Sequence, residues 1–543
     1  MGISQKKTDG SEVAKQYDGI RREMARATLP ASPQAYSIDG RTFGYEIPLK
    51  QALPVGSYVS ITTQNASYLG QITDQNVVIR EGPQYGIGLD PEGLLQLKSS
   101  NSDPHFVDRV RIRDVQGGGD LIGRSTPSGV RPTTGCDVFE EGALEPASVQ
   151  TITSYHAIKG EGQLNVGYAL GTEAGKARVQ LWPKGFRRHT FMCGQSRSGK
   201  TFALGVIIEQ LLLAAADLRI IVIDPNSDFV RLAQIRTKEE HDLALHATSS
   251  DEEYSMRKRR YQPLLSAIRV LRPEPFSPPG LKIRLSDLGS DEQAGVLSLH
   301  PTRDLKAFNT FSGILDRFRG RQYSWQDVVD TRKGDAHGYA SELYMRIANL
   351  RVADWAVWCK GQEPSMQEVM KQEDWRCVVA DVGSLPSSAE RALVAVAVLS
   401  HVWKTKDRSK PVLLVLDEAH NICPQEPTSQ IQEIATDYLT SIAGEGLKYG
   451  VRLLLVSQRP AKIHTSVLTQ CENLILMRMN SRADLESLTH TFSQVPATLM
   501  AQSRYFSQGE SLIAGEIAVS PTFAKFEGRL TQEGGGDVPA TAA

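Results

Sequence analysis

The sequence predicts an α/β protein in which a helix-covered parallel sheet follows a smaller β-rich domain. From about residue 187 onward, near-continuous apolar runs alternate with amphipathic helices, as in strands that are buried on both faces. Before that point, short β-like runs are separated by Gly, Asn, Asp and Pro. A glycine-rich string with the spacing of a phosphate-binding loop opens the α/β part.

Length and composition fit a soluble globular protein of several structural units. The chain has 543 residues, 40% hydrophobic and 23% charged, which excludes a mainly disordered, collagen-like or coiled-coil protein. Lys and Arg total 61 against 62 Asp and Glu, for a formal net charge of −1. Overall charge therefore does not indicate a nucleic-acid-binding protein, and any basic surface must be local.

Cysteine usage and hydropathy predict a cytoplasmic enzyme with no membrane segment. The six cysteines include no CxxC pair, so neither a zinc site nor a disulfide framework is indicated. The N-terminus lacks the apolar core of a signal peptide. The longest apolar stretch, near Leu204 to Ala216, is interrupted by Glu209 and Gln210 and is too short to span a bilayer.

The N-terminal third predicts two parts. Residues 1–35 are polar and end at two prolines, which predicts a flexible arm or a docking helix. Residues 36–183 contain short strand-like runs such as Tyr58–Thr62 and Asn76–Arg80. Many short strands with turn signals favour a small β-barrel or sandwich, with an irregular β-rich domain as the alternative.

Residues 184–530 predict the α/β domain. Its expected helices include Thr201–Ala216 and Ser387–Lys404. A charged, helix-prone stretch at about 230–370 predicts a helical insertion, and 531–543 predicts a disordered tail. The apolar runs expected to form parallel strands are Leu218–Ile223, Cys377–Val382, Val412–Leu416, Leu453–Val456 and Leu474–Met477.

The phosphate-binding string matches the pattern GxxxxGK[ST] and predicts a site for ATP with Mg²⁺. In such a loop, backbone N–H groups surround the phosphates, Lys200 contributes a positive charge, and the Thr201 hydroxyl is a magnesium ligand. The helix that begins there directs its positive dipole end at the same anion. The residues expected to bind the nucleotide are Gly194, Gln195, Ser196, Arg197, Ser198, Gly199, Lys200 and Thr201.

A second acidic site is expected where the buried run Val412–Leu416 ends in Asp417 and Glu418. We expect Asp417 to lie against the metal and Glu418 to orient the attacking water. The string Asp-Glu-Ala-His resembles that of two-lobed helicases, but only 126 residues follow Asp417, too few for a second ATPase lobe. The spacing predicts a one-lobe ATPase that shares its site with a neighbouring subunit.

Two further polar residues lie at expected strand ends. Gln458 follows a strand and is a candidate for sensing the γ-phosphate, with a simple turn residue as the alternative. Asp228 lies just after another strand and either faces the nucleotide or caps the following helix. Sites of parallel α/β sheets lie at the carboxyl ends of strands, where both of these residues are expected.

Several ordered motifs together resemble the HerA-type hexameric DNA translocases of the HerA and FtsK superfamily. The resemblance implies a RecA-like P-loop ATPase core, a barrel domain before it, and a homohexamer that moves double-stranded DNA with ATP. It also implies a partner nuclease, or an anti-phage defence effector, bound through the barrel. The motifs are Arg187–His189, Asp224–Phe229, Asp417–Asn421, Glu445–Gly450 and Ser457–Ile463.

The chain departs from the family pattern at two positions. Asp228 stands where the family often has Glu, so the carboxylate is kept on a shorter side chain. Leu447 stands where the family typically has Arg, so the charge acting on the neighbouring subunit's nucleotide is expected from Lys448 or Arg459. Lysine is the poorer bidentate phosphate ligand of the two.

The DNA contact and the biological role stay open at the level of sequence. The densest basic cluster, Arg257–Arg260, is either a DNA-phosphate contact or a solvated helix face. Arg187 and Arg188 serve either DNA or a subunit interface. The alternatives to a DNA motor are an ATP-dependent oligomeric scaffold that activates an effector, and a pump coupled to a membrane subunit.

Overall fold

The computed structural model describes residues 33–84, 109–126, 129–133, 135, 137–160, 163–171, 177–245, 250–275, 280–331 and 338–534. The chain divides into two compact units: Met1–Tyr155 with Gly171–Gly175, and His156–Leu170 with Lys176–Ala543. The predicted arm at 1–35 lies almost entirely outside the described residues, as does Cys136.

The first unit is a small barrel. Its described sheet has the order β2-β1-β7-β3-β4-β5-β6, and pairing of β2 with β5 closes it, which confirms the predicted N-terminal barrel. Aromatic side chains such as Phe43 and Tyr45 fill the interior. A Cβ at Gly119 would lie 2.4 Å from the Phe43 ring, so glycine is needed there. The strands are β1 (Gln34–Ser37), β2 (Thr42–Pro48), β3 (Tyr58–Thr62), β4 (Ser67–Gln84), β5 (Arg109–Thr126), β6 (Gly129–Pro132) and β7 (Gly142–Pro146).

The second unit is built on a large, mostly parallel sheet. Among the described residues its order is β12-β13-β11-β14-β15-β10-β16-β17-β18-β8-β9, parallel from β12 to β16 and antiparallel beyond. This is the α/β core that the apolar runs predict. The strands are β8 (Leu164–Ala169), β9 (Arg178–Leu181), β10 (His189–Cys193), β11 (Arg219–Asp224), β12 (Ile268–Leu271), β13 (Cys377–Asp381), β14 (Val412–Leu416), β15 (Val451–Ser457), β16 (Cys471–Met477), β17 (Glu510–Ala514) and β18 (Thr522–Phe526).

The boundary between the units differs from the predicted one at 183. Strand β8 pairs with β18 of the large sheet, with Ala169 opposite Ala524, and β9 pairs with β8. Residues 164–181 therefore extend the ATPase sheet and not the barrel. A short strand carries no local signal for which sheet it joins, because both sheets accept the same residue types.

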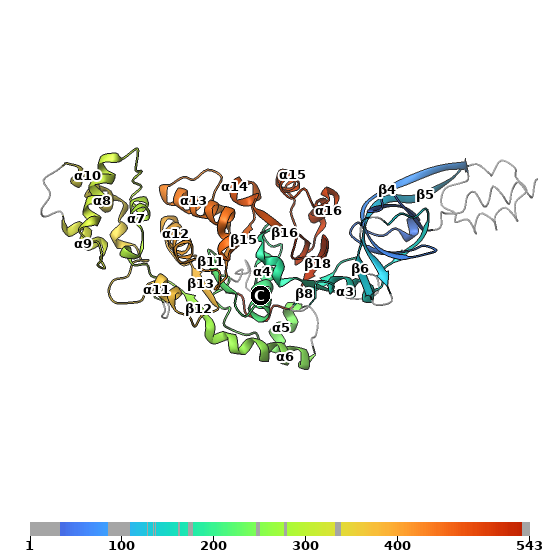
Figure 1. Cartoon of the computed structure of the whole chain (residues 1–543), viewed down its shortest axis with the longest axis horizontal. Helices are drawn as coiled ribbons and strands as arrows, with labels where there is room; N and C mark the ends of the chain where they lie inside the picture. The colour runs from blue at the N-terminus through green and yellow to red at the C-terminus, as the bar shows by residue number, and fades with distance from the viewer. Residues whose placement is uncertain are drawn as a thin grey trace, which may run out of the picture. The chain divides into compact units, whose positions relative to one another are not determined.

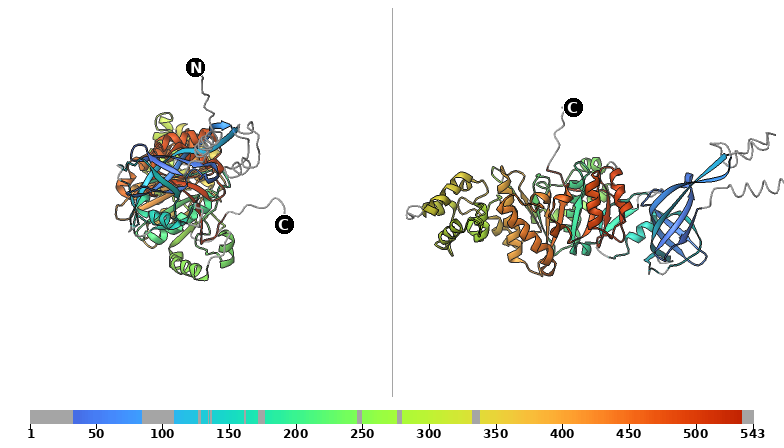
Figure 2. Two further views of the ribbon diagram at one scale, coloured as in Figure 1. Left: turned by 90° about the vertical axis from the view of Figure 1, so that its right-hand side faces the viewer. Right: turned by 90° about the horizontal axis from the view of Figure 1, so that it is seen from above.

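Helices pack against the large sheet and form a separate lobe beside it (Figure 1). The predicted insertion contains α5 to α11 but also β12, which pairs with β13 in the sheet. Figure 2 shows α7–α10 grouped at the end of the sheet near α12 and α13. The helices are α3 (Val149–His156), α4 (Lys200–Ala214), α5 (Lys238–Leu245), α6 (Asp251–Tyr261), α7 (Ser290–Val296), α8 (Leu305–Asp316), α9 (Trp325–Asp330), α10 (Gly338–Leu350), α11 (Met366–Lys371), α12 (Ser388–Thr405), α13 (Gln430–Glu445), α14 (Thr465–Leu468), α15 (Arg482–Thr491) and α16 (Ala497–Ala501).

The structure also bears on the expected disordered tail and on the expected lack of a membrane segment. Thr531 is fully buried, so the predicted disordered tail does not begin at 531. Residues 531–534 are held by hydrogen bonds to distant parts of the chain, and 535–543 lie outside the described residues. Within the described ranges, every helix is too short or too polar to cross a bilayer.

Candidate nucleotide site

The phosphate-binding loop connects the buried strand β10 to α4 and curves as the motif predicts. Gly199 has φ +95° and Arg197 has φ +61°, so the chain turns through the left-handed region twice before the helix starts. A Cβ at Gly199 would lie 2.9 Å from the Gly509 nitrogen. Glycine is therefore required at this position for both conformation and space.

Lys200 is the first residue of α4, and its side chain lies within this loop. Its ammonium donates to the carbonyls of Gly194 and Gln195 at 2.7 and 2.9 Å. Burial lowers the pKa of Lys200, and the nearby carboxylates of Glu418 and Asp417 oppose that shift. The loop thus concentrates a positive charge and the positive end of the α4 dipole at one point, which suits a polyphosphate.

Strand β14 brings the two predicted carboxylates to the same edge of the sheet. Asp417 and Glu418 are both buried, and Glu418 adopts a left-handed φ of +46°. The Glu418 N–H donates to Asp417 Oδ1 at 2.9 Å. Burial and then the neighbouring Glu418 charge raise the pKa of Asp417 to about 8. A carboxylate kept from water in this way gains strongly from a nearby cation.

Two side chains lie against the Glu418 carboxylate. Gln458, at the end of the adjacent strand β15, donates from Nε2 to Glu418 Oε1, so it is more than a turn residue. His420 Nδ1 lies 3.3 Å from Glu418 Oε2 and 3.0 Å from Ser457 Oγ. Gln458 therefore holds one oxygen of the carboxylate that we expect to orient water, while its Oε2 has no hydrogen-bond partner among the described residues.

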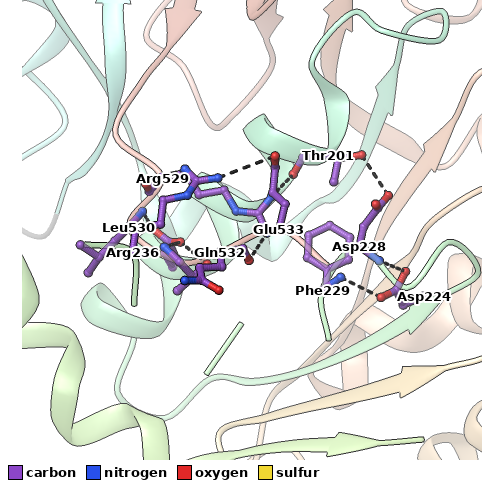
Figure 3. Close-up of polar contacts among 11 residues, drawn as sticks. Thr201, Asp224, Asp228, Phe229, Arg236, Arg529, Leu530, Gln532 and Glu533 are labelled. Atoms are coloured by element: carbon purple, nitrogen blue, oxygen red, sulfur yellow. Dashed lines mark hydrogen bonds and ion pairs between the residues drawn. The ribbon is translucent and has the colours of Figure 1, made fainter. Parts of the chain in front are cut away.

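The loop after β11 carries Asp228 to the start of α4. Buried Asp224 accepts hydrogen bonds from the N–H groups of Asp228 (3.0 Å) and Phe229 (2.8 Å), which shapes the loop. Thr201 Oγ1 then donates to Asp228 Oδ2 at 3.2 Å, as Figure 3 shows. Helix α5 begins only at Lys238, so Asp228 does not cap it. The hydrogen bond to Thr201 places Asp228 at the start of the helix that follows the phosphate loop, and its role beside the nucleotide stays a prediction.

The side chains at this sheet edge fit a nucleotide-bound magnesium ion. The described residues contain no cluster of three His, Cys, Asp or Glu side chains able to hold a metal on their own. Mg²⁺ of ATPases is typically bound by one or two protein oxygens plus phosphate oxygens and water. The Thr201 hydroxyl and the Asp417 carboxylate would hold it, and it would neutralise phosphate charge. Ser198 Oγ is buried in the loop and has no hydrogen-bond partner among the residues that the structure describes.

The remaining basic candidates lie outside this cluster. Arg459 and Lys448 are both exposed, the latter on the short 3₁₀ turn Gly446–Tyr449. Arg187 is exposed, and Arg188 pairs with Glu472 at 3.0 Å on the surface. None of these four side chains is buried in the nucleotide site of its own chain.

The basic cluster on α6 is only partly available for DNA. Arg257 donates to the Gly528 carbonyl and is partly buried, so it has a structural role within the chain. Arg259 and Arg260 are exposed. The helix therefore offers a smaller basic face than its sequence predicts.

The sequence did not predict the residues that contact the first turn of α4 from the C-terminal segment. Arg529 is wholly buried and donates to the Thr201 carbonyl at 3.0 Å (Figure 3). The two residues are separated by 328 positions, so no local pattern connects them. The one available signal was Glu209, a carboxylate in an otherwise apolar helix, which requires a buried polar partner.

Comparison with known proteins points to one family. A family model described as the central domain of helicase HerA matches residues 164–350, from β8 through the phosphate loop to α10. A probable helicase of Methanocaldococcus jannaschii is 35% identical over 133 residues, 24% of this chain and 25% of that protein. The DNA double-strand break repair helicase HerA of Saccharolobus solfataricus is 23% identical over 498 residues, 88% of this chain and 89% of that protein.

Among solved structures, VirB4 of Thermoanaerobacter pseudethanolicus aligns with a TM-score of 0.45 and 15% identity, covering 68% of this chain and 97% of that one. The family match contains the phosphate loop, and the Saccharolobus alignment extends over most of both chains. The chain is therefore similar to HerA helicases along most of its length, its residues 164–350 match the central domain of that family, and it is an ATP-hydrolysing enzyme.

Proposed function

We propose that this protein is a ring-forming motor that uses ATP to move along double-stranded DNA. The observation that carries the proposal is the arrangement around Glu418, which Gln458 holds at the carboxyl end of β14 beside the phosphate loop. The proposal is supported by the likeness to HerA helicases over nearly nine tenths of the chain.

The catalytic roles follow from the positions of the side chains. Lys200 binds the β and γ phosphates, and Glu418 accepts a hydrogen bond from the attacking water and orients it. Gln458 contacts Glu418 from the neighbouring strand and transmits the state of the γ-phosphate to β15. Thr201 and Asp417 would hold magnesium, which would neutralise the phosphate charge.

We propose that the site is completed by a second copy of the chain in a homohexameric ring. The transition state needs a further cation, and the exposed side chains of Arg459 and Lys448 are free to reach a neighbouring protomer. A ring also gives the exposed Arg259 and Arg260 a way to contact phosphates independently of base sequence. The barrel is then the docking site for a nuclease or defence effector in the cytoplasm.

The direct test is ATP hydrolysis in the presence of duplex DNA. We expect blunt duplex DNA without sequence preference to stimulate phosphate release, and stimulation to fall with rising salt because phosphate contacts dominate. If the rate of ATP hydrolysis is the same with and without duplex DNA, both for the protein alone and with its partner, the protein is not a DNA motor.

The alternative function is an ATP-dependent scaffold that gathers and activates an effector. Glu418→Gln distinguishes the two, because it preserves nucleotide binding but removes the carboxylate that orients water. A scaffold with this substitution keeps its partner's ATP-dependent activity. A motor with this substitution assembles in ATP but no longer displaces a third strand from triplex DNA.

A further inference from the structure

The segment Gly528–Gly534, called the strap below, lies against the helix that follows the phosphate loop. The backbone N–H groups of Leu530 and Thr531 both donate to the Glu209 carboxylate of α4 at 2.8 Å. The Thr531 hydroxyl adds a 2.6 Å bond to the same carboxylate. Glu209, Leu530 and Thr531 are all buried, so these hydrogen bonds take the place of water around the Glu209 carboxylate.

The strap also reaches the acidic loop after β11. The Gly534 N–H donates to the carbonyl of Asp228 at 2.9 Å. The strap thus contacts both partners of the Thr201–Asp228 hydrogen bond, α4 on one side and the Asp224–Phe229 loop on the other (Figure 3).

Arg529 is the centre of these contacts. Its Nη1 donates to the Thr201 carbonyl at 3.0 Å and to Glu533 Oε1 at 2.8 Å, and its Nη2 donates to the Gln532 carbonyl at 3.4 Å. The guanidinium carbon lies 5.5 Å from the centre of the Phe229 ring. One planar, permanently charged group therefore connects the first turn of α4, the strap and the acidic loop.

Helix α4 has a glycine where this guanidinium passes. A Cβ at Gly205 would lie 2.5 Å from Arg529 Cζ and Nε. Glycine in the interior of a helix is unfavourable by itself, so the position is explained by the close approach of Arg529.

We propose that Arg529 is a positioning residue of the ATPase site, which sets Thr201 against Asp228 and makes docking of the strap and binding of nucleotide depend on each other. The inference rests on the ATPase site alone and holds whether or not the protein moves DNA. Coupling of this kind is reciprocal: if the docked strap strengthens nucleotide binding, nucleotide must stabilise the docked strap by the same factor.

The reciprocity gives a test that is independent of turnover. Hydrogen–deuterium exchange of the full-length protein, with and without ADP and magnesium, measures protection of the amides of Leu530, Thr531 and Gly534. We expect ADP to slow their exchange by about 5- to 100-fold, the range usual for coupled sites. Arg529→Ala should remove this nucleotide-dependent protection and weaken ADP binding by a similar factor.

Matched variants separate positioning from general stability. Gly205→Ala forces the Arg529 side chain away without changing the sequence of the strap, and should weaken ADP binding in the same way. Gly313→Ala is its control, since a Cβ there meets nothing within 4 Å in another helix. Glu533→Ala changes a side chain that is one third exposed, and provides a test if Arg529→Ala fails to fold. Arg529→Lys keeps the charge and should restore part of the ADP affinity.

The proposal is overturned if Arg529→Ala, Gly205→Ala or Glu533→Ala lowers only the melting temperature. In that outcome, ADP affinity and the ADP-dependent protection of the strap stay at wild-type values in the folded protein. A strap whose exchange does not respond to ADP in the wild-type chain would overturn it equally.

Discussion

The side chain of Lys200 satisfies its hydrogen bonds with the loop's own carbonyls, those of Gly194 and Gln195. A phosphate that enters the loop offers charged oxygens in place of these neutral ones, and charge-assisted bonds are the stronger kind. The lysine is thus positioned to exchange weaker partners for stronger ones when ATP binds.

Lys200→Ala should lower ATP turnover by about 100- to 1,000-fold, because it removes the charge that stabilises the phosphates in the transition state. Steady-state phosphate release measures this effect, and circular dichroism with thermal unfolding checks that the fold is intact. Hydrolysis at the wild-type rate in the folded variant would show that the nucleotide is bound elsewhere.

Gln458→Ala should lower turnover by about 10-fold or more while ADP affinity changes little, because the glutamine positions Glu418 and not the loop. Single-turnover hydrolysis together with equilibrium ADP binding separates the two effects. Gln494→Ala, at an exposed position outside the site, is the control and should leave both values unchanged.

The sequence predicted the residues of this site to the extent that their chemistry is local. The phosphate loop, Asp417 and Glu418 lie in short motifs at strand ends, and the parallel sheet brings those ends together. Arg529 and the ring of His420 were not assigned roles, because their contacts are with residues far away in the sequence, Thr201 for Arg529 and Ser457 for His420. The position of Glu209 in an apolar helix indicates that its carboxylate needs a buried polar partner. The sequence does not indicate that the partners are Leu530 and Thr531.

At the scale of elements, the sequence predicted the bounds of the buried strands closely, but it did not predict which strands pair with each other in the sheet. The run Val412–Leu416 has the same bounds as β14, and Tyr58–Thr62 the same bounds as β3. Continuous apolar runs are specific for strands covered on both faces, which explains this accuracy. Strand β12 was missed because it lies in a charged, helix-rich stretch and joins the sheet only at its edge.

A buried carboxylate of the lobe, that of Glu292, binds two helices of the core. Glu292 of α7 accepts hydrogen bonds from Ser400 and Lys404 of α12 at 2.6 and 2.9 Å, and from Tyr438 of α13 at 2.6 Å. Burial acts to raise the pKa of Glu292, but these donors outweigh it and hold the pKa below its ordinary value. The ionised form is therefore favoured in the folded state.

Glu292→Gln should destabilise the protein by about 1 to 3 kcal/mol at pH 7, because buried donors lose a charged acceptor. A lowered carboxyl pKa contributes stability that is present above the ordinary value of 4.5 and is lost as pH falls through the folded-state pKa. The difference from wild type should thus shrink below about pH 4.5 in urea unfolding. Lys404→Ala, whose side chain is half exposed, should cost less than about 1 kcal/mol.

At the scale of the whole assembly, a shared site can be tested by mixing inactive protomers. A Lys200→Ala protomer lacks its own phosphate lysine but still offers Arg459 to a neighbour. An Arg459→Ala protomer keeps its phosphate loop and needs that neighbour. Co-purified mixed rings should regain ATP hydrolysis that neither variant shows alone, and the same mixture with Lys448→Ala identifies which cation acts between subunits.

Failure of both mixtures at every ratio would contradict the shared site. Recovery with Lys448→Ala but not with Arg459→Ala would place the trans-acting charge on the 3₁₀ turn after α13. Either recovery supports a ring, since it requires contact between neighbouring protomers.

The pairing of β8 with β18 determines where the chain can be cut. A fragment that starts at residue 184, as the change in sequence texture suggests, would leave open the edge of β18 that pairs with β8, while the other edge stays paired with β17. Such an edge pairs readily with other chains, so that fragment should aggregate. A fragment that starts at residue 156 retains the β8–β9 hairpin as a cover and is the one to choose for crystallisation of the catalytic part.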